Sequence, residues 1–376
     1  MYINRTRKGA KSFQGIWLPF IIFTIFTAVT CELPAQSDGK IPLIWCTDLF
    51  HPHQDPDDHL DLITVFSMPE FDVLAILLDQ GAKQTKEPGS LVVEQMMALT
   101  GHRVAYAAGL ADKLKSIDDK GEDQDPAYQS AIELFLSTLR KSRKPVQVIV
   151  AGSLRDVAAA YNREPELVRE KVAMLHINIG NAALKGEEWN VNLDPFAYRQ
   201  ILESGLPISW YPCKPYYNSK SSHFLLKRYG DVFDQAPIPL QNFIIYALNR
   251  VDPAEIEPIN ALGMDLRPWR QLIWGREKDM WCTASIIHAA GRKIYKLDGE
   301  WMTIQGPPPE GAVEMEVFTM VPARIQVDQK GFTERLDYDA TDPNVVTIQS
   351  KDYQQYTEAM TGCLKYLFKH FPSGMK

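Results

Sequence analysis

Short apolar segments that end in polar or glycine-containing loops recur along this chain and alternate with segments of helical pattern. This rhythm is typical of parallel strands joined by crossover helices, because parallel neighbours need a long connection between them. Four strands are predicted on this basis, at Leu43–Cys46, Val73–Leu78, Val146–Val150 and Val172–Ile177. The sequence therefore predicts an α/β fold: one large domain with a mostly parallel, Rossmann-like central sheet flanked by helices.

Carboxylates are concentrated just after the first predicted strand. Asp48 follows the strand directly, and Asp57 and Asp58 lie side by side after a loop. Carboxylates this close repel one another unless they are solvated, protonated or neutralised by a counter-charge. A hard divalent cation such as Ca²⁺ or Mg²⁺ is the simplest neutraliser, and a solvated acidic loop that begins the next helix is the structural alternative. These residues alone leave both interpretations open.

The carboxyl ends of the predicted strands are the place where open α/β sheets bind ligands. Asp48, Ala151 and Asn181 each follow or end such a strand. We therefore expect these three residues to be neighbours in space.

A second candidate segment places an acid, an aromatic ring and an amide in sequence, at Glu188, Trp189 and Asn190. Carboxylate and amide groups hold sugar hydroxyls, and a ring packs on the face of a sugar or a base. The segment also predicts a helix entry, with Asp194 as N-cap and Pro195 as the first helical residue. The two interpretations are compatible, because capping concerns Asp194 and recognition concerns Glu188 and Asn190.

The N-terminus has the layout of an export signal. Basic residues precede the apolar run Ile16–Val29, and small and polar residues follow it as far as Ala35. The run is shorter than the ~20 residues that a membrane-spanning helix needs, although an uncleaved membrane tether stays open. We predict a signal peptide at residues 1–35, a single domain at residues 36–376, and an exported, periplasmic or extracellular protein.

Charge and cysteine content limit the class of partner. The formal net charge is −7, and no basic run follows the signal, which argues against nucleic acid and favours a small-molecule ligand. The four cysteines beyond the signal lack the spacing of a metal site or of a disulfide framework, so their pairing stays open. These cysteines are Cys46, Cys213, Cys282 and Cys363.

The order of these elements resembles that of the inosine-uridine preferring nucleoside hydrolases. That family opens with a strand and an aspartate, two adjacent aspartates, an apolar helix and a Pro-Glu step into the second strand. The matching residues are Thr47-Asp48, Asp57-Asp58, Leu60–Phe66 and Met68-Pro69-Glu70, and the resemblance runs from about Pro42 to Phe371. The loop Leu49–Pro56 departs from the family pattern, because it is longer and adds His51, His53 and Asp55. The two histidines are candidate ligands, substrate contacts or surface residues.

The resemblance implies roles for particular residues. Those identified with the family's Ca²⁺ ligands are Asp48, Asp57, Asp58, Ala151 through its backbone carbonyl, and Asp279. Asp48 is also identified with the general base. The residues similar to those that bind ribose are Asn181, Glu188 and Asn190, and Trp189 and Trp281 are candidates to stack on the base.

Two positions differ from the family pattern on the substrate side. Lys278 stands where many members have a histidine that helps the base to leave, and its reference pKa of about 10.4 suits proton donation at neutral pH less well. Lys278 is nevertheless the candidate catalytic acid. Ala82 stands at the place of an asparagine that holds ribose, with Asp79 and Gln80 as nearby substitutes.

The resemblance implies a glycosidase that cleaves the N-glycosidic bond of a purine or pyrimidine ribonucleoside with a Ca²⁺-bound water and an aspartate base. It also implies assembly as a homodimer or homotetramer. Two alternatives remain. One is a hydrolase of the same fold that acts on another ribosyl or glycosyl compound, with His51, His53 or Lys278 as the acid; the other is a calcium-containing protein that binds without turnover.

Overall fold

The computed structural model describes residues 39–51 and 56–375, which fall within one compact unit, Leu33–Lys376. The predicted signal peptide lies outside the described residues, as do His53 and Asp55 of the acidic loop. In the part of the chain that is described, no helix is both long and apolar enough to span a bilayer.

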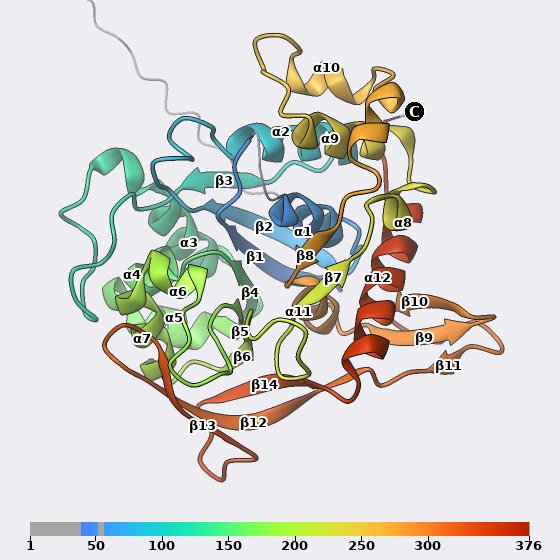
Figure 1. Ribbon diagram of the computed structural model, residues 1–376. Helices are drawn as coiled ribbons and strands as arrows, with labels where there is room; N and C mark the ends of the chain where they lie inside the picture. The colour runs from blue at the N-terminus through green and yellow to red at the C-terminus, as the bar shows by residue number, and fades with distance from the viewer. Residues whose placement is uncertain (1–38, 52–55, 376) are drawn as a thin grey trace, which may run out of the picture. The chain divides into compact units, whose positions relative to one another are not determined.

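A nine-stranded sheet forms the centre of the fold (Figure 1). Its strands, in spatial order, are β13 (Thr333–Tyr338), β12 (Phe318–Val327), β14 (Val345–Ser350), β6 (Ile208–Tyr211), β5 (Val172–Asn178), β4 (Val146–Ala151), β1 (Ile41–Thr47), β2 (Phe71–Leu78) and β3 (Ala105–Ala108). The strands from β14 to β3 are parallel, whereas β12 and β13 extend one edge in antiparallel pairing. The predicted mostly parallel sheet is thus confirmed, and β1, β2, β4 and β5 are the four strands predicted from sequence.

Both faces of this sheet are buried. Consecutive side chains of a strand point to opposite sides of the sheet, so one strand can contribute to hydrophobic clusters on both faces. In β1, Leu43 and Trp45 pack into one hydrophobic cluster, whereas Ile44 and Cys46 pack into the other. Apolar stripes of helices cover each side. The first cluster includes residues of α1 (Asp57–Phe66), α2 (Ser90–Thr100), α8 (Gly230–Phe233), α9 (Ile238–Leu248), α10 (Pro258–Leu262), α11 (Thr283–Ala289) and α12 (Tyr353–Lys369). The second includes residues of α3 (Ser130–Lys141), α4 (Arg155–Arg163), α5 (Pro165–Lys171), α6 (Trp189–Leu193) and α7 (Pro195–Glu203).

Two smaller sheets and two short 3₁₀ helices complete the described elements. The strands β7 (Phe224–Leu226) and β8 (Lys278–Met280) form an antiparallel ribbon, with Leu225 opposite Asp279. A second antiparallel sheet has the order β10 (Glu300–Ile304), β9 (Lys293–Leu297) and β11 (Val313–Glu314). The 3₁₀ helices are η1 (Pro126–Tyr128) and η2 (Arg267–Leu272).

The cysteines whose pairing the sequence left open are free thiols in this structure. Cys46, Cys213, Cys282 and Cys363 are all buried and unbridged. They therefore act as small apolar side chains in the fold, as buried free thiols usually do.

Candidate active site

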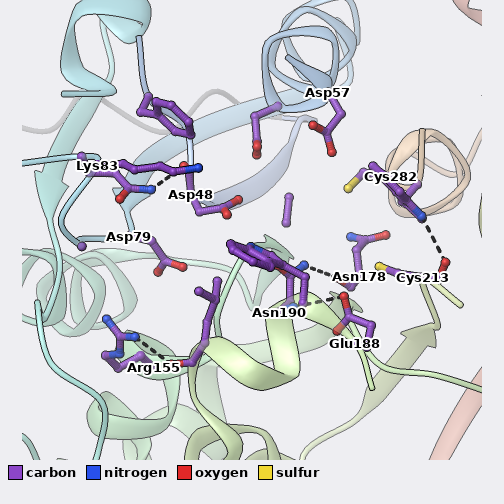
Figure 2. A pocket seen from close by; sticks show the side chains of 18 of the residues that line it. Asp48, Asp57, Asp79, Lys83, Arg155, Asn178, Glu188, Asn190, Cys213 and Cys282 are labelled. Carbon is purple, nitrogen blue, oxygen red and sulfur yellow. Dashed lines mark hydrogen bonds between the residues drawn. The ribbon is translucent and has the colours of Figure 1, made fainter. Parts of the chain in front are cut away.

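A pocket of about 630 Å³ lies at the carboxyl ends of β1, β2, β4 and β5, where an open α/β sheet is expected to bind its ligand (Figure 2). Three groups of side chains give it its character. The acidic group is Asp48, Asp57, Asp58, Asp79 and Glu188; the basic group is Lys83, Arg155 and Lys214; the aromatic group is Phe50, Trp189, Tyr216 and Trp281.

The carboxylates from the start of the chain meet in this pocket, as the sequence predicts. Figure 2 shows Asp48, Asp57 and Asp79 directed into the same cavity. Burial, followed by the charges of Asp79 and Asp57, raises the pKa of Asp48 to about 8. Burial, followed by the charges of Asp48 and Asp57, raises the pKa of Asp58 well above its usual value, although Thr47 donates a hydrogen bond to it. The site therefore concentrates negative charge for which a proton or a cation is the counter-charge.

A lysine lies at the edge of this acidic cluster. The Lys278 ammonium nitrogen is 3.5 Å from Asp57 Oδ1 and 4.9 Å from the centre of the Trp281 ring. The Lys278 side chain is only 4% exposed, and Lys278 is not among the pocket-lining residues. Lys278 thus supplies one positive charge beside the carboxylates, and its role as the leaving-group acid stays a prediction.

The loop after β4 packs against Asp48 and Asp79 through Gly152 and Ser153, which the sequence did not single out as site residues. The Ser153 backbone N–H donates to Asp79 Oδ2 at 2.7 Å, which joins the loop after β4 to the end of β2. A Cβ atom at Gly152 would lie 2.9 Å from the Asp48 backbone nitrogen and 2.8 Å from Asp79 Oδ2. Glycine is therefore required at position 152 for this close approach, because a backbone atom cannot move aside as a flexible side chain can.

Arg155 ties the loops around the pocket together. Its buried guanidinium forms an ion pair with Asp194, with Nε 3.2 Å from Oδ2. The same group donates to four backbone carbonyls, those of Gln80, Leu110, Ala111 and Leu193, at 3.2, 2.8, 3.3 and 3.0 Å. These carbonyls belong to the loops after β2 and β3 and to the end of α6. The sequence carried no local sign of this role, since every partner is distant along the chain.

The predicted sugar-binding segment lines the pocket from α6. Glu188 caps this helix, with its carboxylate accepting from the backbone N–H groups of Gly180, Asn190 and Val191 at 2.9, 3.1 and 3.0 Å. Burial raises the pKa of Glu188 despite these hydrogen bonds. Capping therefore involves Glu188 as well as Asp194, which caps α7 as predicted by accepting from the Ala197 N–H.

An asparagine that the sequence did not single out lies next to Asn190. The Asn190 amide donates to the backbone carbonyl of Asn178 at 3.0 Å, and Asn178 is the last residue of β5. The Asn178 side chain lines the pocket and donates to the Val150 carbonyl, while its Oδ1 has no hydrogen-bond partner among the described residues. Asn178 thus occupies the strand end where Asn181 was predicted to bind the sugar.

Several predicted residues lie away from the pocket. Asn181 is not among its lining residues, and its side chain instead bonds the Ala183 N–H and the Glu187 carbonyl. Asp279 is also absent from the lining, and its carboxylate bonds His223 at 2.7 Å. His51 is buried against Tyr246, with its ring nitrogen 3.1 Å from the Val251 carbonyl.

Part of the predicted metal shell matches the donor chemistry of the pocket. Asp48, Asp57 and Asp58 offer hard carboxylate oxygens, and Ala151, at the end of β4, lines the same cavity. Over the described ranges, no group of three or more His, Cys, Asp or Glu side chains is already gathered as a metal site. The buried, mutually repelling carboxylates fit a hard divalent cation on this side of the pocket, and Asp279 is not part of that arrangement.

Fold and pocket together define an α/β protein with an acidic and aromatic ligand site at the carboxyl edge of its sheet. The family model described as inosine-uridine preferring nucleoside hydrolase matches residues 52–258, more than half of the chain. The chain belongs to this family, which confirms the resemblance noted in its sequence.

Individual relatives are similar over part or most of the chain. The pyrimidine-specific ribonucleoside hydrolase RihA of Citrobacter koseri is 30% identical over 189 residues, which cover 45% of this chain and 58% of RihA. RihA from an Escherichia coli strain is 30% identical over 175 residues, covering 40% of this chain and 55% of RihA. The chain thus matches somewhat more than half the length of these relatives.

Solved structures show the same fold at low sequence identity. The plant nucleoside hydrolase PpNRh1 superposes with a TM-score of 0.52 and 14% identity, covering 86% of this chain and 99% of PpNRh1. The type III effector protein XopQ, solved in complex with adenosine diphosphate ribose, gives a TM-score of 0.53 and 13% identity, covering 89% of this chain and 96% of XopQ.

Replacing Arg155 by methionine is expected to lower the free energy of unfolding by about 3–5 kcal/mol, because it leaves the buried Asp194 carboxylate unpaired. Denaturant-induced unfolding followed by circular dichroism measures this change. The control is Arg140→Met, which breaks the exposed pair with Glu164 and should cost no more than about 1 kcal/mol. Equal midpoints for the two variants would contradict the structural role given to Arg155.

Replacing Gly152 by alanine is expected to push the loop after β4 away from Asp48 and to lower thermal stability without changing any charge. The matched control is Gly275→Ala, because a Cβ at Gly275 meets no atom within 4 Å. Differential scanning fluorimetry compares the two variants. A melting temperature for Gly152→Ala as high as that of Gly275→Ala would show that the loop yields easily.

Proposed function

We propose that this protein hydrolyses the N-glycosidic bond of a ribonucleoside, with Asp48 as the general base. The observation that carries the proposal is the meeting of Asp48, Asp57 and Asp58 with the Glu188 and Asn190 segment in one pocket. Membership of the nucleoside hydrolase family and the similarity to RihA, which is named for ribonucleoside hydrolysis, support it.

The residue types in the pocket suit this reaction. The ribosyl carbon reacts through a cationic, oxocarbenium-like transition state, so the site must supply negative charge near the sugar and a base for the attacking water. Asp48 accepts the proton of that water, and Asp57, Asp58 and Asp79 contribute negative potential around it. Glu188, Asn190 and Asn178 line the wall where sugar hydroxyls would be bound.

We further propose Ca²⁺ as the cofactor, since members of this family use a metal ion. Asp48, Asp57, Asp58 and the backbone carbonyl of Ala151 would hold it. When bound, the ion supplies positive charge that keeps the carboxylates ionised and orients water and sugar hydroxyls. Asp279 is left out of this ligand set because its carboxylate bonds His223.

The base of the nucleoside is proposed to lie against the aromatic group of the pocket. Trp189, Tyr216 and Trp281 all line the cavity, and Trp189 is 63% exposed, so its ring is free to pack on a planar ligand. Purine and pyrimidine bases both fit this description. Export from the cell and assembly as a homodimer or homotetramer stay predictions.

The first test is the release of free ribose from a panel that includes inosine, uridine and cytidine. Asp48→Asn should lower the rate by at least about 10²-fold, the usual lower range for loss of a general base. Glu203→Gln, on the exposed end of α7, is the matched control and should retain the wild-type rate. Full activity in Asp48→Asn would remove Asp48 from the mechanism. Release from non-nucleoside ribosides alone would point to another ribosyl compound, and no release at all to a binding protein.

The cofactor proposal predicts that Ca²⁺ raises the melting temperature and that a chelator lowers it, because the ion would bind only the folded carboxylate cluster. The double variant Asp57→Asn/Asp58→Asn should show no shift with Ca²⁺. Scanning fluorimetry with Ca²⁺, Mg²⁺ and chelator measures this without substrate. A wild-type protein whose melting temperature ignores all three additions would contradict a bound divalent ion.

A further inference from the structure

A buried histidine and an aspartate form a hydrogen-bonded pair just behind the pocket. His223 immediately precedes β7 and is fully buried, and Asp279 lies in the middle of β8. The two strands pair in antiparallel register, which brings His223 Nε2 to 2.7 Å from Asp279 Oδ1. The proposed function gives no role to either residue.

Hydrogen bonds on both ring nitrogens fix the orientation of the His223 ring. The backbone N–H of Tyr217 donates to Nδ1 at 3.2 Å, so Nδ1 is an acceptor. The ring proton is therefore on Nε2, which donates it in the hydrogen bond to Asp279. The Tyr353 hydroxyl lies 3.3 Å from the same Nδ1. The imidazole therefore has one defined tautomer and little freedom to rotate.

This fixed ring supports an aromatic side chain of the pocket. Tyr216 stacks on His223 with ring centres 4.6 Å apart and planes 21° apart, and Tyr353 is parallel to His223 at 6.3 Å. Tyr216 is 42% exposed and lines the pocket. Trp281, which also lines the pocket, has its ring centre 6.0 Å from that of Tyr216 and 5.9 Å from that of His223.

We propose that His223 and Asp279 are positioning residues that hold the Tyr216 ring as the surface on which the planar base of the substrate stacks. The pair acts through Tyr216 and touches neither the sugar nor the attacking water. It thereby selects a flat aromatic leaving group in preference to an aliphatic one. The inference rests on the proposed function for its substrate class, and it is tested by base binding, which needs no turnover.

The experiment measures the affinity of the protein for hypoxanthine, for uracil and for D-ribose by isothermal titration calorimetry. Asp279→Ala should weaken binding of the bases about five- to tenfold, the range expected for losing one well-placed aromatic contact, and leave ribose affinity unchanged. Asp279→Asn should restore base affinity, since the amide oxygen still accepts the His223 N–H. Asp231→Ala, which removes a surface pair with Arg228, is the control and should match wild type.

A double-variant cycle tests whether the pair acts through Tyr216. In the Tyr216→Ala background, Asp279→Ala should have no further effect on base affinity, because the ring that the pair positions is gone. Additive losses, an unchanged base affinity in Asp279→Ala, or a wild-type protein that binds neither base would each overturn the proposal. If the bases bind in the expected pattern but no nucleoside is hydrolysed, the proposed function fails while the positioning role stands.

Discussion

The geometry of the pocket depends on the buried ion pair between Arg155 and Asp194. Asp194 caps α7 and accepts a hydrogen bond from the Leu114 N–H. Arg155, the first residue of α4, donates to backbone carbonyls of the loops after β2 and β3 and of the end of α6. A guanidinium has five N–H donors in a rigid, planar group, so one side chain can fix several backbone segments at once. The loops after β2, β3 and α6 therefore keep their positions relative to one another, which a site built from many strand ends requires.

The pocket also carries a balance of charge that limits what it can bind. Desolvated carboxylates at Asp48 and Asp58 are unfavourable without a counter-charge, and Lys278 beside Asp57 supplies only one. Because the pKa of Asp48 is raised to about 8, its carboxyl group is mostly protonated at neutral pH, which removes one of the negative charges. A divalent cation would displace that proton and return Asp48 to the ionised form that a general base needs. The carboxylate cluster and its proposed cofactor thus depend on each other, because the cluster needs the positive charge that the cation would supply.

The sequence predicted the sheet and the acidic half of the site because both depend on local patterns. Apolar runs that end in polar loops identify β1, β2, β4 and β5, and the spacing of Asp48, Asp57 and Asp58 around one loop is visible without a fold. The role of Arg155 and the contact of Asp79 with Ser153 could not be assigned in this way, since the partners are 38 or more residues away. Asn181 and Asp279 were assigned to the site from a family pattern, but the end of each strand decides which side chain enters the pocket. The strand β5 ends at Asn178, and the Asp279 carboxylate bonds His223 next to β7.

The two halves of the pocket come from different parts of the fold, and this separation matters for function. The carboxylates follow β1 and β2 and begin α1, so they are held by the core of the parallel sheet. Tyr216 and Trp281 belong to the segments after β6 and β8, and His223 and Asp279 behind them lie at the small β7-β8 ribbon. The ribbon shares no strand with the main sheet, but it meets the acidic group where Lys278 of β8 lies 3.5 Å from Asp57. Substitutions of Tyr216 or Trp281 that leave Lys278 in place would therefore alter the aromatic surface of the pocket without removing a carboxylate or its counter-charge.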